Sequence, residues 1–384
     1  MCQSAYTREL KHFKNEAKGV VNAMNTMDTE KISRQLSQFQ GTITMCADGF
    51  IDEVWEIVDS RASAKDFTLI SKMTQFADRI NVAGTGGLGM EIVKKRRAFG
   101  GFTANIGYAA ACLGVNTNLA GIYGKEKIDP IFSPLNDVCN VISLGDPAVT
   151  LVLEFGDGKI LMTDMEPMLT MDWKHIVDTI GKEKLVSLLT GSDILGVGYW
   201  SLFPAFDEIV SEICAVLPQD GKVRRFFFDF ADVRKRDGAS LAKTLKLLGG
   251  LNDKNPMILS VNEHEAAVLF ALYNETFDDT NGPLLEKAAN VRKQAGLAEL
   301  VIHTPHFAAV STQADGTAMI PQEFCEKPVR TAGAGDTFNG GYIAGILAGL
   351  DINERLYTAS NAVSFFLNNG HAPSIQNLVD RLKV

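Results

Sequence analysis

From residue 42 onward, short apolar runs alternate with longer segments in which apolar residues recur at helical spacing. The run TITMCA at 42–47 is followed by the helical segment ANIGYAAACLG at 104–114 and the run NTNLAGI at 116–122. The alternation continues with strand-like runs at 193–200, 225–230, 257–261, 299–304 and 307–312, and with helical segments at 206–217, 241–249 and 262–272. Strands connected by helices run parallel to one another. The order therefore predicts an α/β fold with a doubly wound, mainly parallel sheet and helices on both faces.

Two segments break this alternation. Residues 51–61 (IDEVWEIVDSR), with the loop-rich stretch up to residue 101, show strand patterns without a following helix. Residues 148–163 (AVTLVLEFGDGKILMT) have the pattern of a β-hairpin that turns at GDGK. Neither segment fits a doubly wound core, so together they predict a small separate sheet across one end of it.

The N-terminal 40 residues form a further unit. They are helix-prone and amphipathic in places, as in TRELKHFKNEAKGVVNAM at 7–24. We expect a helical extension over 1–40, packed on or beside a main domain that covers 41–384.

Composition excludes several classes of protein. The chain has 384 residues, is 46% hydrophobic and carries a net charge of −9, which argues against non-specific binding to nucleic acid or anionic membrane. No apolar run approaches the roughly 20 residues that span a bilayer, and the N-terminus lacks the order of a signal peptide. The six cysteines include no C-x-x-C pair. We expect a cytoplasmic protein with neither a nucleic-acid nor a membrane partner.

The stretch GTGGLG at 84–89 matches the dinucleotide-binding pattern G-x-G-x-x-G. That pattern functions only between a strand and a helix, with an acidic residue about 20 positions further on. No Asp or Glu occurs between Glu91 and Glu126, and the preceding residues make a poor strand. The stretch is therefore interpreted as a flexible loop.

The stretch TAGAGDTFNGG at 331–341 changes from bare backbone to a small apolar helix. Gly333, Ala334 and Gly335 leave successive backbone N–H groups at the start of that helix, where unpaired donors and the helix dipole can hold an anion. Asp336 lies in the first turn, within reach of such an anion. Taken alone, it would also be explained as an acidic residue that stabilises a helix start.

The chain resembles the ribokinase-like sugar kinases, also called the phosphofructokinase-B family. Besides the motif at 331–341, the family's motifs occur in order in the sequence: ADGFIDEV at 47–54, GGFTANIGYAAACLG at 100–114, FDFADVR at 228–234 and NEHE at 262–265. Within FDFADVR, Asp229 and Arg234 match the family pattern. The resemblance covers about 42–384 and implies that the two unusual segments, about 52–99 and 148–163, form a β-sheet lid, often used in homodimers.

The resemblance also implies the catalytic groups. Asp336 would accept the proton of a sugar hydroxyl, while the N–H groups of Gly333, Ala334 and Gly335 would stabilise the γ-phosphoryl group of ATP during transfer.

On the sugar side, Asp52, read as the end of the first strand, and Asn105 would bind hydroxyl groups. Gly100 and Gly101 would let the sugar approach the backbone. From its sequence position alone, Asn105 is equally explained as a residue that caps its own helix.

Nucleotide and metal residues follow from the same resemblance. Asn262 and Glu265 would hold Mg²⁺ through water, although the same pair also fits a capping box. Thr304 and Asn361 would border the nucleotide. The family's turn glycines are replaced by His306 and Ala309, which weakens the nucleotide assignment; from the sequence, His303 and His306 are packing and surface residues.

Arg330 stands where the family usually has an aspartate that helps to bind a monovalent cation, and Ala332 replaces a threonine. We expect Arg330 to supply the positive charge beside the nucleotide phosphates, so that no monovalent cation is required. The alternative is that Arg330 points to solvent.

Two other functions remain open at this point. A nucleoside kinase of the same fold would need an aromatic slot for a base, which Phe50, Trp55, Phe67 or Phe102 could supply. A catalytically silent sugar-binding member would fit the departures at Arg330 and His306.

Overall fold

The computed structural model describes residues 27–278 and 284–382. Most of the expected N-terminal helical extension lies outside these residues. Its last part is the helix α2 (Thr29–Gln38). Asp28 is the N-cap residue of α2, and its carboxylate accepts a hydrogen bond from the Lys31 N–H. Ile32 and Leu36 of α2 are buried in the main core. This part of the extension therefore packs on the main domain.

A large central sheet confirms the predicted α/β class. Within the described residues its strand order is β14-β13-β12-β11-β10-β9-β1-β5-β6, and the pairs from β12 to β6 are parallel while β13 and β14 are antiparallel additions. The strands are β1 (Thr42–Cys46), β5 (Asn116–Gly121), β6 (Asn140–Ser143), β9 (Ile194–Val197), β10 (Arg225–Asp229), β11 (Met257–Asn262), β12 (Glu299–His303), β13 (Phe307–Thr312) and β14 (Gly316–Pro321).

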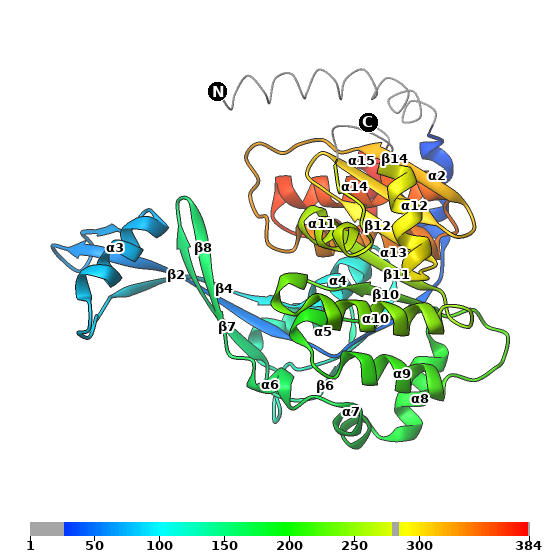
Figure 1. Ribbon diagram of the computed structural model, residues 1–384, viewed down its shortest axis with the longest axis horizontal. Coiled ribbons are helices and arrows are strands. Elements are labelled where there is room, and N and C mark those ends of the chain that lie inside the picture. Colours follow the sequence, from blue (N-terminus) through cyan, green and yellow to red (C-terminus); the bar gives the residue numbers. More distant parts are fainter. Residues whose placement is uncertain (1–26, 279–283, 383–384) are drawn as a thin grey trace.

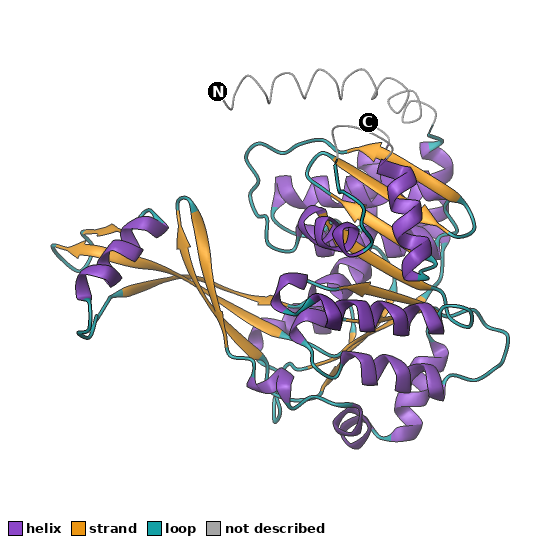
Figure 2. Cartoon of the chain, viewed as in Figure 1, coloured by secondary structure: helices purple, strands orange, loops and turns teal. Residues whose placement is uncertain are grey.

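Helices cover both faces of this sheet, as Figures 1 and 2 show. One face carries α8 (Lys182–Gly191), α9 (Phe206–Val216), α10 (Gly238–Leu251), α11 (Glu263–Leu272) and α12 (Leu284–Ala295). The other carries α4 (Phe102–Cys112), α13 (Ala334–Leu347), α14 (Ile352–Asn369) and α15 (Ile375–Leu382). Shorter helices are α5 (Ser133–Asn136), α6 (Glu166–Leu169), α7 (Trp173–Ile180), η1 (Pro130–Phe132), η2 (Trp200–Leu202) and η3 (Val233–Lys235). No helix among the described residues is long and apolar enough to cross a membrane.

The strand β10 shows why the sheet needs both helix layers. Phe226 and Phe228 belong to the core beneath α9 and α10, whereas Phe227 between them belongs to the core beneath α13 and α14. Successive strand residues point to opposite faces, so a run of three phenylalanines requires apolar cover on each side.

A second, smaller sheet projects from one end of the main domain (Figure 1). It pairs β2 (Phe50–Arg61) with β3 (Phe67–Leu69), β4 (Ile92–Gly100) and β7 (Ala148–Phe155), and β7 continues into β8 (Gly158–Thr163). The hairpin predicted at 148–163 is present, with Phe155 opposite Gly158. We call this sheet, with the segment between β3 and β4, the lid.

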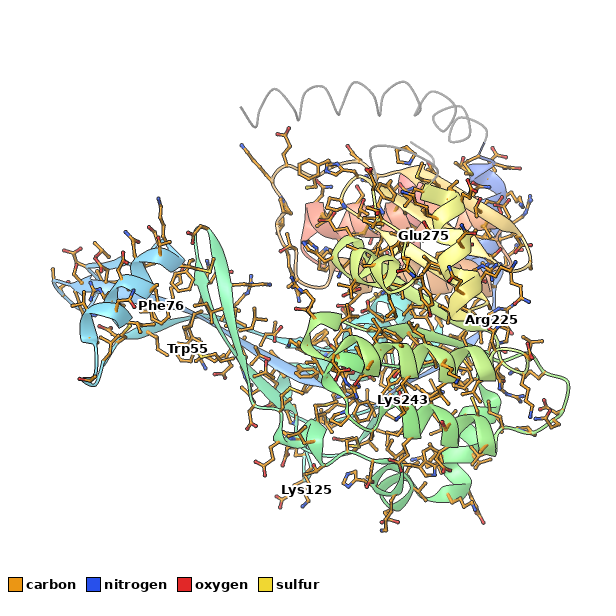
Figure 3. All side chains as sticks on the ribbon, in the orientation of Figure 1. Trp55, Phe76, Lys125, Arg225, Lys243 and Glu275 are labelled. Carbon is orange, nitrogen blue, oxygen red and sulfur yellow. The ribbon has the colours of Figure 1, made fainter. Side chains whose placement is uncertain are left out.

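The lid has a small apolar cluster of its own, built from Ile57, Ile70, Leu153 and Phe155. Trp55 and Phe76, labelled in Figure 3 far from the main domain, pack against it. Phe76 belongs to α3 (Met73–Ala83), so the expectation of a loop-rich stretch without a helix was wrong here. The GTGGLG stretch follows α3 directly and has no strand before it, in agreement with its interpretation as a loop.

Candidate active site

The site is built around the start of α13. Gly333 is the N-cap residue and has a left-handed backbone with φ of 92°, a conformation that favours glycine. The N–H of Ala334 donates to the Thr331 carbonyl at 3.1 Å, whereas no carbonyl among the described residues accepts from the N–H of Gly333 or Gly335. Of the three donors expected from the sequence, Gly333 and Gly335 are therefore available to an anion and Ala334 is used in a turn.

Asp336 lies in the first turn of α13 and is almost fully buried. Its carboxylate accepts hydrogen bonds from Asn105 Nδ2 at 2.9 Å and from Tyr199 Oη at 3.0 Å. Burial, and after it the nearby Asp229 carboxylate, raises the pKa of Asp336 to about 7. The arrangement gives a fixed carboxyl group that changes protonation near neutral pH, as a general base should.

The two donors to Asp336 come from distant parts of the chain. Asn105 lies in the first turn of α4, and Tyr199 follows the carboxyl end of β9. Sequence reasoning placed Asn105 near the sugar but missed Tyr199. The available signal was its position just beyond a buried parallel strand, where side chains gather at functional sites.

The Asp229 carboxylate lies near Asp336, and Glu265 in turn lies near Asp229. Asp229, at the end of β10, accepts hydrogen bonds from Asn339 Nδ2 at 3.0 Å and from the Ala231 N–H at 2.9 Å. Burial raises the pKa of both Asp229 and Glu265. The Asp229 carboxylate raises the pKa of Glu265 further, and the Asp48 carboxylate adds to the shift of Asp229. Arg234, the other residue matched in that motif, is exposed and pairs with Asp232.

Asn262 and Glu265 form the capping box that the sequence allowed. Glu265 accepts from the Asn262 N–H at 3.0 Å and from Asn262 Nδ2 at 2.7 Å, while Asn262 Oδ1 caps the first turn of α11. No group of three His, Cys, Asp or Glu residues in the described part of the chain has the geometry of direct metal ligands. A cluster of mutually repelling carboxylates nevertheless suits a divalent cation held through water, because Mg²⁺ keeps several of its waters. The residues present thus fit Mg²⁺ in this outer mode.

A hollow of about 580 Å³ opens beside Gly335, which forms part of its wall. Its walls come from the ends of β11 and β12, the loop after β14 and the helices α13 and α14: Asn262, Glu263, His264, His303, Thr304, Pro305, Gln322, Glu323, Phe324, Cys325, Glu326, Pro328, Thr331, Ala334, Gly335, Phe338, Val363, Ser364 and Leu367. The hollow therefore meets the start of α13, where a nucleotide would present its phosphates.

Thr304 lines this hollow, as expected from the sequence, and its hydroxyl also closes a turn by accepting from the Phe307 N–H at 3.0 Å. Asn361 does not line it. Its Nδ2 donates to the Tyr357 carbonyl and its Oδ1 accepts from Arg381, so the assignment of Asn361 to the pocket wall was wrong. Val363, Ser364 and Leu367 of α14 supply the wall instead.

The two histidines differ from the sequence interpretation in one respect. His306 stacks on Phe324 at 5.0 Å between ring centroids, as a surface packing residue can. His303, however, lines the hollow, lies on Phe338 and has a covered Nε2 without a partner among the described residues. Burial lowers the pKa of His303 to about 4, so its ring is neutral at pH 7.

The expected sugar side needs one correction. The first strand, β1, ends at Cys46, and the aspartate that follows it is Asp48, which is fully buried and caps α4 by accepting from the N–H groups of Phe102 and Thr103 at 2.8 and 2.7 Å. Asp52 does not end the first strand. It is the third residue of β2 in the lid, because the chain enters a new strand at Phe50.

Asp52 nevertheless lies beside the two predicted glycines. A Cβ on Gly100 would lie 3.0 Å from Asp52 Oδ2, so the carboxylate occupies the space that this glycine leaves open. Gly101 has φ of 97° and is the N-cap of α4. Burial raises the pKa of Asp52, while Lys159, Arg330 and Arg96 oppose that shift. The lid thus brings a carboxylate to the mouth of the site.

Arg330 is half-buried and does not extend into open solvent. Its guanidinium lies over the Phe366 ring, 5.6 Å from the centroid, and its Nη2 is 4.0 Å from the position of a Cβ on Gly333. Burial lowers the pKa of Arg330, whereas Asp52 and Asp336 favour its charged form. The structure places this positive charge beside the N–H groups of the α13 start rather than on the wall of the hollow.

Sugar and nucleoside kinases are among the solved structures with this architecture. Arabidopsis thaliana ribokinase complexed with ribose and ATP matches with a TM-score of 0.62 and 15% identity over 90% of this chain and 100% of that one. Cryptococcus neoformans ribokinase in complex with ADP gives 0.61 and 15%, over 89% and 100%. Methanocaldococcus jannaschii nucleoside kinase gives 0.59 and 15%, over 90% and 99%. The protein has the ribokinase-like fold that its motifs predicted.

Comparison of the sequence with known proteins shows which family of ribokinase-like kinases the chain belongs to. The profile of the prokaryotic ketohexokinase family matches residues 22–383, and the chain belongs to that family. The ketohexokinase of Haloferax volcanii is 26% identical over 344 residues, which cover 88% of this chain and 90% of that protein. The protein is therefore a carbohydrate kinase of the ribokinase-like type.

Proposed function

We propose that this kinase transfers the γ-phosphoryl group of ATP to a hydroxyl group of a ketohexose. The observation that carries the proposal is Asp336, a buried carboxylate fixed by Asn105 and Tyr199 at a helix start with unused N–H groups. The substrate class comes from the name of the Haloferax volcanii relative. An aromatic slot for a base, which a nucleoside kinase needs, is not supported at Phe102, because its side chain is fully buried in the core.

In the proposed mechanism, Asp336 takes the proton of the attacking hydroxyl. The N–H groups of Gly333 and Gly335 stabilise the negative charge on the phosphoryl oxygens. Asp52 accepts hydrogen bonds from other hydroxyls of the sugar. Mg²⁺, held through water by Asn262 and Glu265, would neutralise phosphate charge when bound.

The nucleotide would occupy the hollow lined by His303, Thr304 and Phe338. Its phosphates would then lie at the start of α13, where Gly335 lines the hollow. The contact between Gly335 and the His303 ring supports this placement. A Cβ on Gly335 would lie 3.1 Å from His303 Cε1, so glycine keeps the ring and the backbone close together.

The test is ATP turnover with a panel of ketohexoses, aldohexoses, pentoses and nucleosides, followed by mass spectrometry of the product. We expect turnover with a ketohexose and a loss of at least about 10²-fold in kcat for Asp336→Asn. Asp137→Asn, an exposed change of the same kind, is the control and should leave kcat unaltered.

Three results would contradict the proposal. Turnover of nucleosides in preference to every sugar would show a different acceptor. An Asp336→Asn variant with the wild-type rate on the true substrate would remove Asp336 from the chemistry. Binding of sugar without any turnover would indicate a silent sugar-binding protein.

A further inference from the structure

Arg330 occupies an unusual position for an arginine. It ends the loop between β14 and α13, three residues before the N-cap Gly333. The ring of Phe366, on α14, lies under its guanidinium at 5.6 Å, which fixes the side chain against the helix start. With Nη2 4.0 Å from the Cβ position of Gly333, the guanidinium lies beside the N-cap residue of α13.

The donors of Arg330 are unused. No hydrogen bond or ion pair joins Arg330 to any residue in the described ranges. Other sheltered arginines have acceptors: Arg355 donates to Glu299 and to the Leu350 carbonyl, and Arg224 donates to Asp220 and to the Thr190 carbonyl. No nitrogen of Arg330 is among the buried polar atoms without a partner in the described residues, so its five N–H donors are open to a ligand. Such a group is suited to a ligand that brings several acceptor oxygens.

The positive charge of Arg330 indicates which kind of ligand it would bind. The Asp52 and Asp336 carboxylates both favour the positive charge of Arg330, so it lies within their field on the reacting side of α13. A neutral sugar would not use a full positive charge there. A phosphoryl group would, because its oxygens are anionic and fit the guanidinium fork.

We propose that Arg330 donates hydrogen bonds to the transferring phosphoryl group and stabilises its charge in the transition state. This inference rests on the proposed kinase function and adds a catalytic residue to it. During the step, the sugar oxygen bonds to the γ-phosphorus as Asp336 takes its proton, and the bond between that phosphorus and the β–γ bridging oxygen breaks to release ADP. Arg330 forms no covalent bond and transfers no proton.

The kinetic test compares Arg330→Ala, Arg330→Lys and Lys327→Gln. Lys327→Gln removes a positive charge from an exposed position of the same loop and should retain the wild-type rate. Arg330→Ala should lower kcat by about 10²–10³-fold, the effect of removing a transition-state donor, with KM for sugar and ATP changed by no more than about threefold. Arg330→Lys should stay far below wild type, because an ammonium cannot form the planar fork.

A binding test separates catalysis from structure. Calorimetry would measure MgADP binding with a ketohexose, with and without aluminium fluoride, which mimics the phosphoryl group in flight. Arg330→Ala should bind MgADP as wild type does but lose the tightening caused by aluminium fluoride. Added guanidinium ion should restore part of its turnover. Wild-type turnover should be equal in K⁺ and Na⁺ at constant ionic strength, since the positive charge is built into the chain.

The outcomes separate this inference from the function on which it rests. If the wild-type protein phosphorylates no sugar, both the proposed kinase function and the proposed role of Arg330 fail. If wild type is active and Arg330→Ala or Arg330→Lys matches its kcat, only the role of Arg330 fails. A defect confined to the KM of the sugar, or strong K⁺ activation of wild type, also overturns that role. Should Arg330→Ala fold poorly by thermal melting, Arg330→Lys decides the question.

Discussion

At the scale of single residues, the site depends on a carboxylate kept in a nearly dry position. Among the described residues, Asn105 and Tyr199 are the donors to Asp336, and burial outweighs both of them in setting its pKa. The same environment would be unfavourable in a purely structural residue. It suits a general base, because a base whose pKa lies near neutrality takes a proton readily and is still ionised in about half of the molecules at pH 7.

A pH dependence follows from the Asp336 pKa. The pKa is raised to about 7, so the base is protonated below that pH, and kcat/KM for the sugar should fall as the pH drops from 8 to 6. Tyr199→Phe removes a donor that stabilises the ionised form, so its midpoint should move to higher pH. Initial rates across this range, with ATP saturating, give both midpoints. A wild-type midpoint near pH 4, or an unmoved midpoint in Tyr199→Phe, would contradict the assignment.

At the scale of elements, the lid has two roles: it holds its own strands together away from the main domain, and it brings residues to the site. Its own apolar cluster around Ile57 and Leu153 keeps its strands together as they extend from the main domain (Figure 1). Its base, where β2 and β4 meet α4, carries Asp52 and Gly100 to the site. Movement of the lid as a unit would close the site and exclude water from the transferring group.

We expect the lid to become ordered when both substrates bind. Amide hydrogen exchange in 52–99 and 148–163 should slow by at least about tenfold at the strand residues nearest the site, because closure protects backbone groups that open on slow timescales. Mass spectrometry with ketohexose and a non-hydrolysable ATP analogue measures this. The central strand β10 serves as the internal control and should not change. Exchange in the lid that is identical with and without ligands would exclude closure.

At the scale of the whole molecule, the lid exposes apolar side chains that no other part of the described chain covers. Val82 on α3 is 89% exposed and Met162 on β8 is 47% exposed, far from the helix layers of the main domain. Exposed apolar residues that together form a patch commonly mark an interface. The possible homodimer through the lid, expected from the family resemblance, remains a prediction.

Light scattering after size exclusion should give a mass twice that of the 41.7 kDa chain. The paired change Val82→Asp and Met162→Asp should shift the protein to the mass of one chain, because a charge in an apolar interface loses its hydration. Val223→Asp, which alters an exposed valine outside the lid, is the matched control. A monomeric wild type at tens of micromolar, or a double variant that stays dimeric, would rule out the lid as the interface.

The sequence alone determined the features that depend on neighbouring residues. The strand–helix alternation gave the fold class, the turn residues at 156–159 gave the hairpin, and Asn262 with Glu265 gave the capping box. These patterns are local, because backbone hydrogen bonding within a helix or hairpin joins residues only a few positions apart. The position of Asp336 at the start of α13 could be predicted for the same reason.

Only the tertiary structure decided which distant groups meet. Tyr199 reaches Asp336 across 137 positions in the chain, Asp48 rather than Asp52 follows the first strand, and Arg330 packs on the Phe366 ring. Each outcome depends on where strand ends and side chains come together in space. The burial that raises the pKa of Asp336 is likewise a property of the packed layers, and no short stretch of sequence contains it.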